Sequence, residues 1–150
     1  MPTQVPPEQI EPQSLDDYLA VMSKAIFQAG MSWRVVESKW PGIQAAFQGF
    51  DVHKVADFNE RDIEELTKDA RVIRNQRKLD AIVGNARRMI DLDREYGSFR
   101  DYLRAHGDFD ATLTVMRKDF KFMGPMATYY FLYVVGEEVP LHEVFREKYP

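Results

Sequence analysis

Residues 110–136 read DATLTVMRKDFKFMGPMATYYFLYVVG, and this stretch decides the fold. It predicts a helix from about Ala111 to Asp119 and a tight, glycine-containing turn over 120–124. Pro125 then opens an apolar helix over 126–135, which Gly136 ends. Two helices joined by so short a turn form a helical hairpin.

The turn has the chemistry of an anion site. The first N–H groups of its second helix lack partners within that helix and carry a partial positive charge. Lys121, Arg117 and Lys118 add full charges beside them. The stretch therefore predicts either a phosphate-binding turn or an ordinary helical hairpin packed into the core.

Helical signals continue on both sides of the hairpin. Apolar residues at the spacing of one helical face follow a capping box expected at Ser14-Leu-Asp-Asp17. Further helices are expected from Trp33 with Ser32 as cap, from Pro41 to about Phe47, after a cap at Asn59, over 76–96 before Gly97, after a cap at Ser98, and over 141–149. No period-2 pattern is sustained, so the expected fold class is all-α. The expected organisation is a flexible, proline-rich leader over 1–13 and one helical domain over 14–150.

Composition excludes several classes of protein. The 150 residues include no cysteine, which rules out disulfides, thiolate zinc sites and a cysteine nucleophile. They include only three histidines, which are scattered along the chain. The longest nearly apolar run, 126–135, is far shorter than the roughly 20 residues that cross a bilayer. Without a signal-peptide pattern either, we expect a cytoplasmic protein with no membrane span.

The net charge of −4 does not indicate a polyanion partner. Six bases but only one acid lie within residues 71–88, however. This run predicts either a local basic patch or a solvated helix face.

Three blocks of the sequence together resemble the DNA-3-methyladenine glycosylase I family of the helix-hairpin-helix glycosylases. Phe120-Lys-Phe-Met-Gly124 looks like the family's hairpin, and Gln28-Ala-Gly-Met-Ser-Trp33 looks like the segment before its base pocket. Asp69-Ala-Arg-Val-Ile-Arg-Asn75, Lys78 and Gly84-Asn-Ala-Arg87 resemble its central helix. The blocks occur in the family's order and span most of the chain.

The resemblance implies a monofunctional DNA glycosylase of base-excision repair. Such enzymes turn a damaged nucleotide out of duplex DNA and cut its N-glycosidic bond, here with an alkylated, 3-methyladenine-like purine as substrate. They need no organic cofactor, and the resemblance allows a monovalent cation at the hairpin when DNA is bound. The partner implied is damaged duplex DNA, and we expect a monomer.

The family's roles carry over to matching positions. The resemblance implies that Trp33 stacks on the flipped base, that Gly30 and Met31 press into the gap left behind, and that Met123 and Gly124 hold a phosphate. Lys121 would anchor the DNA backbone beside that turn. Arg74, Asn75 and Lys78 match a polar cluster that either contacts DNA or forms structural hydrogen bonds, and Asn85 is expected to be structural. Phe120 and Phe122 are expected to pack inside.

The sequence also departs from the family's pattern. Ala25 stands where the family has the glutamate that hydrogen-bonds the adenine edge, which removes a specific acceptor. The family's structural zinc is not expected, because Pro140 stands near the matching histidine and no cysteine follows. The resemblance therefore leaves open which base is recognised.

A carboxylate after the hairpin suggests a catalytic group. Many helix-hairpin-helix glycosylases have an aspartate about twenty residues past the hairpin's last glycine, and Glu143 lies 19 residues past Gly124, beside His142. Glu143 is either a catalytic residue or a solvated residue that favours the dipole of a C-terminal helix. Two alternative functions also stay open: a non-catalytic DNA-binding relative, and a helical protein-interaction module.

Overall fold

The computed structural model describes residues 6–150, in which all regular structure is helical. The α-helices are α1 (Leu15–Gln28), α2 (Trp33–Ala46), α3 (Val52–Ala56), α4 (Glu60–Thr67), α5 (Gln76–Tyr96), α6 (Phe99–Leu103), α7 (Phe109–Asp119), α8 (Pro125–Val134) and α9 (His142–Lys148), with a short 3₁₀ turn over Gln48–Phe50. These residues contain no β-strand, so the predicted all-α class is confirmed.

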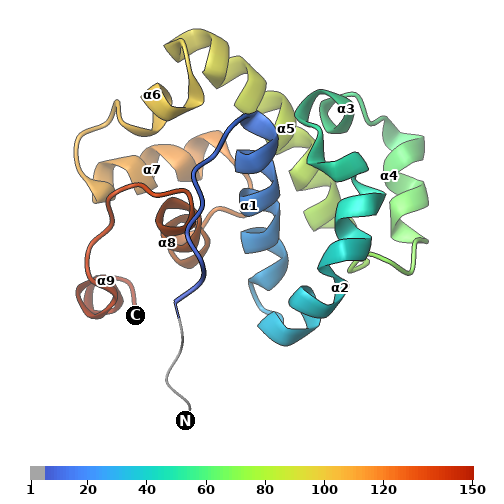
Figure 1. Cartoon of the computed structure of the whole chain (residues 1–150), viewed down its shortest axis with the longest axis horizontal. Coiled ribbons are helices and arrows are strands. Elements are labelled where there is room, and N and C mark those ends of the chain that lie inside the picture. Colours follow the sequence, from blue (N-terminus) through green and yellow to red (C-terminus); the bar gives the residue numbers. More distant parts are fainter. Residues whose placement is uncertain (1–5) are drawn as a thin grey trace.

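Two helices form the centre of the molecule. α1 packs against α8, α5 and α2, while α5 packs against α3, α4 and α6. As Figure 1 shows, α2, α3 and α4 lie on one side of this pair, and α6 to α9 lie on the other. The hairpin between α7 and α8 therefore reaches the centre from one side, and the loop before α2 reaches it from the other.

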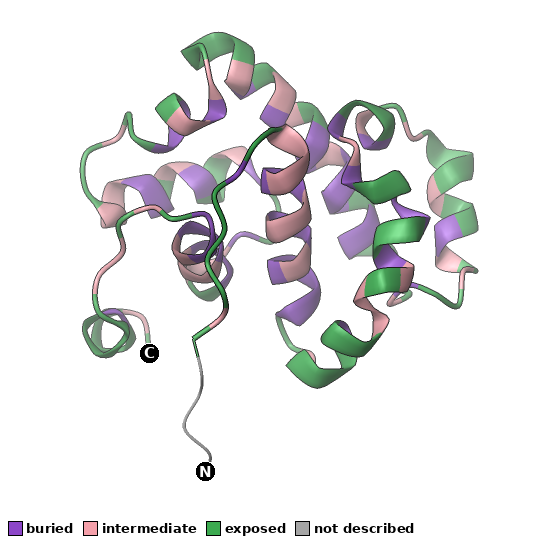
Figure 2. Cartoon of the chain, in the orientation of Figure 1, coloured by how far each residue is buried: buried purple, intermediate pink, exposed green. Residues whose placement is uncertain are grey.

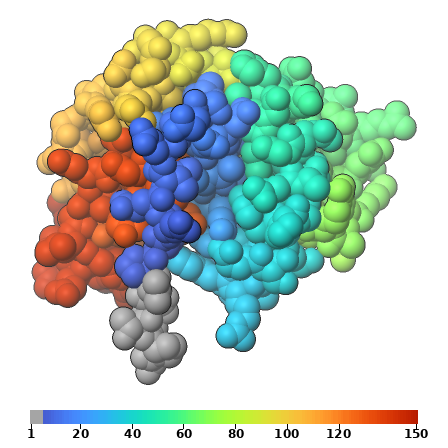
Figure 3. Space-filling model, viewed as in Figure 1, coloured from blue at the N-terminus to red at the C-terminus, as the bar shows by residue number. Residues whose placement is uncertain are grey.

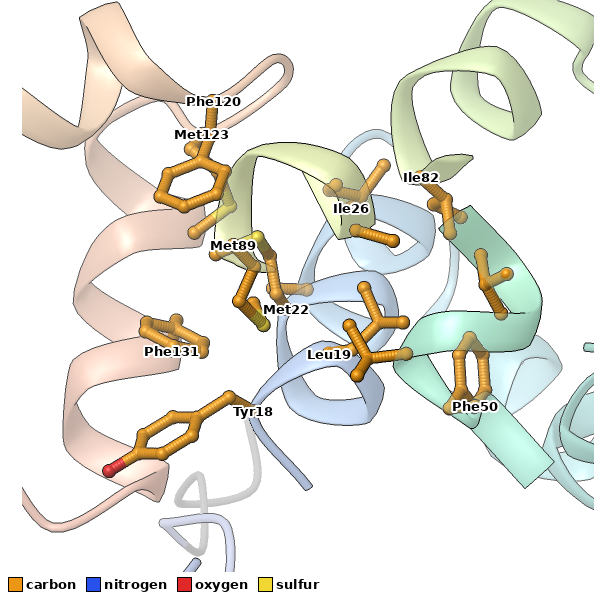
Figure 4. Packing of buried hydrophobic residues seen from close by; sticks show 14 of the residues in the cluster. Tyr18, Leu19, Met22, Ile26, Phe50, Ile82, Met89, Phe120, Met123 and Phe131 are labelled. Atoms are coloured by element: carbon orange, nitrogen blue, oxygen red, sulfur yellow. The ribbon is translucent and has the colours of Figure 1, made fainter. Parts of the chain in front are cut away.

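The packing of buried side chains explains why α1 and α5 lie at the centre. Figure 2 shows that the helices turn their buried faces inward, and Figure 4 shows α1 residues meeting side chains from α5, α8 and the hairpin. Met22, Met89 and Phe131 are fully buried, and Phe120 and Met123 are nearly so. Burying such a side chain contributes about 1.5–3 kcal/mol, so the hairpin is part of the core rather than an appendage.

Several helix boundaries agree with the local signals. Asn59 forms a complete capping box with Asp62, as predicted, and Ser98 accepts a hydrogen bond from the Asp101 N–H. The long helix α5 spans 76–96 as predicted, and Gly97 follows it at φ +87°. These signals succeed because each depends on only a few consecutive residues.

Helices begin after Ser14 and Ser32 as predicted, but the expected capping hydrogen bonds and the new helix at Pro41 are wrong. The side chains of Ser14 and Ser32 make no capping hydrogen bond; instead, Asp17 accepts a hydrogen bond from the Gln13 N–H. Pro41 lies inside α2 and does not start a new helix. Proline removes only one hydrogen bond, and the buried side chains of α2 on both sides of it keep the helix continuous.

The leader is extended over its described part, residues 6–13. The Ile10 N–H donates to the Val134 carbonyl at 2.8 Å, the Gln9 side chain donates to the Tyr133 carbonyl at 2.9 Å, and Pro12 is buried. Figure 3 shows this segment (blue) on the surface, against the orange and red C-terminal elements. The first five residues of the predicted leader lie outside the described residues.

Within residues 6–150, no helix combines the length and the apolar composition that crossing a membrane requires.

Candidate functional site

The hairpin turn is held from behind by one side chain of α5. The Asn85 amide donates to the Lys121 carbonyl at 3.0 Å, and the Lys121 N–H donates to Asn85 Oδ1 at 2.9 Å. Asn85 is only 2% exposed, while the Lys121 side chain is exposed. Asn85 therefore has the structural role expected of it, and it presents Lys121 to solvent.

The two phenylalanines of the hairpin differ. Phe120 is buried as predicted, but Phe122 is 41% exposed, so its predicted burial is wrong. Its backbone adopts φ +62°, a left-handed conformation that is unusual for a bulky residue. This conformation turns Phe122 outward between the two buried residues Phe120 and Met123.

The start of α8 leaves N–H donors free beside the turn. Gly124 precedes the helix without a side-chain cap, and Pro125 occupies its first turn. An open groove of about 450 Å³ lies along this end, lined by Ala29, Phe122, Gly124, Pro125, Met126, Ala127 and the C-terminal residues 148–150. Ala29 in that lining shows that the loop before α2 and the hairpin share one face of the molecule.

The loop before α2 is held by a second side chain of α5. The Lys78 ammonium donates to the Ala29 carbonyl at 2.7 Å, and burial lowers the pKa of Lys78. Next to Ala29, Gly30 adopts φ +75° with open space around it, so the backbone conformation, not crowding, favours glycine there. Met31 follows, half-buried against the core.

One helix thus fixes both candidate DNA-contacting segments. Lys78 and Asn85 are seven residues apart on α5, which is about two helical turns, so they lie on one side of it roughly 10 Å apart along the axis. Lys78 holds the loop of Gly30 and Met31, while Asn85 holds the hairpin. The distance between the two segments is therefore set by a rigid element.

Trp33 lies at the start of α2 with 44% of its surface exposed. Its ring meets Tyr130 of α8 edge to face, with the ring centroids 5.4 Å apart and an interplanar angle of 78°. Ala25 is buried on α1 and offers no polar group. One turn further on, Gln28 is also buried, and its Oε1 accepts no hydrogen bond from the described residues.

Charge near this aromatic pair comes from Glu37, one turn after Trp33. Glu37 forms an ion pair with Lys24 of α1. Burial raises the pKa of the Tyr130 phenol to about 12, Glu37 acts in the same direction, and the Gln28 amide acts in the opposite direction. Tyr130 therefore stays protonated at neutral pH and can donate a hydrogen bond.

The basic run over 71–88 is largely used within the protein. Four of its six bases have partners: Arg71 with Asp69, Lys78 with Ala29, Arg87 with Ala56 and Phe58, and Arg88 with Asp119. Arg74, singled out from the sequence, is exposed, and so is Arg77. The run is therefore neither a continuous patch nor a simple solvated face.

Glu143 lies on α9, and the residues at the end of this helix, 148–150, line the groove beside the hairpin. Glu143 is exposed in the first turn of α9, a helix that Phe145 anchors against Tyr129 at a ring distance of 4.3 Å. In Figure 1, α8 and α1 lie between α9 and α2, the helix that begins with Trp33. A catalytic role for Glu143 stays a prediction.

The residues present do not fit the zinc that the resemblance would imply. The chain has no cysteine. Within the part of the chain that the structure describes, no three His, Asp or Glu side chains gather where they could hold a metal ion.

Sequence reasoning missed Tyr130 and Gln28. Tyr130 belongs to an apolar helix in which an aromatic residue is expected as core, and its partner Trp33 is 97 positions away. Gln28 carried a weak signal, because a polar residue on the buried face of α1 needs a partner.

The sequence is similar to a known family and to named relatives. The model of the methyladenine glycosylase family matches residues 14–116, and that match ends just before the hairpin. DNA-3-methyladenine glycosylase 1 of Escherichia coli (strain K12) is 30% identical over 130 aligned positions, which cover 73% of this chain and 70% of the relative. DNA-3-methyladenine glycosylase of Haemophilus influenzae is 34% identical over 76 positions, covering 51% of this chain and 41% of that protein.

Solved structures extend the likeness through the hairpin. The 3-methyladenine DNA glycosylase I of Staphylococcus aureus superposes with a TM-score of 0.76 at 23% identity, covering 86% of this chain and 80% of the other. A variant of a 3-methyladenine DNA glycosylase I, solved in complex with 3-methyladenine, has a TM-score of 0.76 at 25% identity and covers 86% of this chain and 81% of the other. The fold and the sequence match together show that this chain belongs to the methyladenine glycosylase family.

Proposed function

We propose that this protein is a monofunctional DNA glycosylase that releases an alkylated, 3-methyladenine-like purine from duplex DNA during base-excision repair. Family membership and relatives named as DNA-3-methyladenine glycosylases support this activity. The observation that carries the proposal is the half-exposed Trp33, held on one face with the hairpin through Lys78 and Asn85.

These positions support a separate role in DNA binding or base recognition for each segment. The free N–H groups at the start of α8 and the exposed Lys121 would hold the DNA backbone. Gly30 and Met31, on the loop that Lys78 holds, would enter the duplex where the damaged nucleotide leaves it. Trp33 would then stack on the flipped base.

The chemistry asked of the protein is modest. Alkylation at N3 makes adenine cationic, so the base is already a good leaving group. An electron-rich indole against a cationic base contributes about 1–2 kcal/mol when water is excluded. Water attacks the sugar carbon as the bond to the base breaks, and the product DNA keeps an abasic site.

Base release from heavily methylated duplex DNA tests the proposal. Freed bases are separated by chromatography for the natural protein, for Trp33→Ala, and for Val35→Ala as a control on the same helix. Val35 is also a partly exposed apolar residue of α2. We expect release of 3-methyladenine that falls about 10- to 100-fold in Trp33→Ala and is unchanged in Val35→Ala.

The same assay separates the alternatives. Salt-sensitive DNA binding without base release would favour the non-catalytic relative, which Ala25 makes a real candidate. Neither binding nor release would favour the protein-interaction module. The monomeric state, the cytoplasmic location and a monovalent cation at the hairpin stay predictions, which light scattering, cell fractionation and cation-dependent DNA binding would check.

A further inference from the structure

Gln28 is an unusual residue for the inside of a protein. Only 6% of the residue is exposed, so it is 94% buried. Its Oε1 nevertheless has no hydrogen-bond partner among the described residues. Buried acceptors are nearly always paired, and an unpaired one destabilises the fold. An unpaired acceptor beside a candidate binding site therefore points to a ligand.

The neighbours of Gln28 define what that ligand meets. The Gln28 amide lowers the pKa of Tyr130, as an N–H donor directed toward the phenol oxygen does. Oε1 is the atom of this amide that has no hydrogen-bond partner among the described residues. Trp33 packs on the same tyrosine, so Gln28, Tyr130 and Trp33 belong to one cluster of side chains.

The aromatic pair leaves no space for a base between its two rings. A base stacked between two rings needs about 3.5 Å on each side, or roughly 7 Å in all. The rings of Trp33 and Tyr130 are in edge-to-face contact at 5.4 Å, which leaves no room for a third ring. A base can stack between Trp33 and Tyr130 only if the two rings separate.

Resting on the proposed function, we propose that Gln28 Oε1 recognises the exocyclic amine of a flipped 6-aminopurine, and that Trp33 and Tyr130 part to admit the base. An acceptor oxygen accepts a hydrogen bond from a 6-amino group, whereas it is repelled by the oxygen of a 6-oxo group. Gln28 thus supplies the acceptor that Ala25, one turn earlier on α1, lacks. Glu37 is the rival acceptor, but it pairs with Lys24 and is 61% exposed at its side chain.

The test compares two free bases that differ only at position 6, 3-methyladenine and 3-methylhypoxanthine. Binding is measured by calorimetry, so no glycosylase activity is required. We expect the natural protein to prefer 3-methyladenine by about 10- to 100-fold, which is the effect of pairing or opposing one buried acceptor. Gln28→Leu reduces this preference to within about 3-fold.

Two further variants test the same role of Gln28 if Gln28→Leu does not fold. Gln28→Glu has nearly the same shape and two acceptor oxygens, so it retains the preference for 3-methyladenine. Tyr130→Phe removes the group that orients the amide, so the amide can turn its Nε2 toward the base and the preference falls. Ser23→Ala is the matched control: Ser23 is also buried and unpaired on α1, about 140° around the axis from Gln28, and its loss leaves the preference unchanged.

Fluorescence checks that the aromatic pair opens. Trp33 and Trp40 are the two tryptophans, so Trp40→Phe leaves Trp33 as the single reporter. We expect 3-methyladenine to change its emission, because the base replaces Tyr130 as its neighbour.

Different results would overturn the role of Gln28 and the glycosylase activity. An unchanged preference in Gln28→Leu, or no base binding by the natural protein at millimolar concentration, overturns the role of Gln28. Base binding with the expected preference, but no release from methylated DNA, supports that role and overturns the glycosylase activity.

Discussion

Replacement of Asn85 tests whether α5 positions the hairpin. Asn85→Ala removes both hydrogen bonds to the Lys121 backbone. Asn85→Asp keeps the bond accepted from the Lys121 N–H but places a carboxylate oxygen where the amide donated to the Lys121 carbonyl. The two variants therefore separate the loss of a contact from the introduction of a repulsion.

The magnitude follows from the two bonds, at 3.0 and 2.9 Å, and from the burial of Asn85. One hydrogen bond contributes about 1 kcal/mol net, and a buried group left unpaired costs about 1–3 kcal/mol. We expect Asn85→Ala to lower the free energy of unfolding by about 2–4 kcal/mol. For Asn85→Asp, burial and the facing carbonyl raise the pKa of the introduced carboxyl above its unfolded value of about 3.9.

The raised pKa gives Asn85→Asp a pH dependence with a definite sign. Below pH ~3.9 the carboxyl is protonated in both states and can donate to the Lys121 carbonyl, so its contribution to stability is complete. That contribution is lost as the pH rises through the folded-state pKa. Relative to Asn85→Ala, the Asp variant is therefore more stable at pH 4 than at pH 7.

Urea unfolding at pH 4 and 7 and salt-dependent binding to duplex DNA measure these effects. Asn59→Ala is the control, because Asn59 caps α4 away from the hairpin and its loss costs about 1 kcal/mol. We expect Asn85→Ala, but not Asn59→Ala, to weaken DNA binding about 10-fold, because Lys121 is no longer presented. A stability loss below about 0.5 kcal/mol with normal DNA binding would refute the positioning role of Asn85.

Four further changes have defined outcomes. Lys78→Met keeps the buried stem but frees the Ala29 carbonyl, and it should reduce base release about 10-fold in the chromatographic assay. Gly30→Ala forces a Cβ at φ +75° and should lower stability by about 1–2 kcal/mol in urea; no loss would show that the loop relaxes freely. Tyr130, with its pKa raised to about 12, makes stability fall as the pH rises from about 10 to 12, and Tyr130→Phe should remove that part of the fall in alkaline unfolding curves. Glu143→Gln should retain base release within about 3-fold, whereas a loss of about 100-fold would restore its catalytic role.

Local signals predicted most of the helices. The cap at Asn59, the glycine after α5 and the proline that opens α8 each act on a few consecutive residues, and the structure confirms them. Pro41 was misjudged because a helix interior can accept a proline when tertiary packing keeps the helix together. The family resemblance added the expected roles of the Trp33 loop and of the hairpin.

The site itself was only partly predictable. Lys78 could equally have contacted DNA or made structural hydrogen bonds, and only its distance from Ala29 shows which partner it has here. The exposure of Phe122 depends on a left-handed backbone that no sequence pattern indicated. Tyr130 was not identified from the sequence, because it belongs to an apolar helix in which an aromatic residue is expected to pack in the core.

By itself, the sequence determined the all-α class, the hairpin, the absence of a cysteine-based metal site and the family. Each of these depends on residue type or on spacing within a few helical turns. Only the tertiary structure decided that Asn85 holds Lys121, that Lys78 holds Ala29 and that the Trp33 ring packs against Tyr130. These contacts join residues 36 to 97 positions apart, and such partners are chosen by how the helices pack.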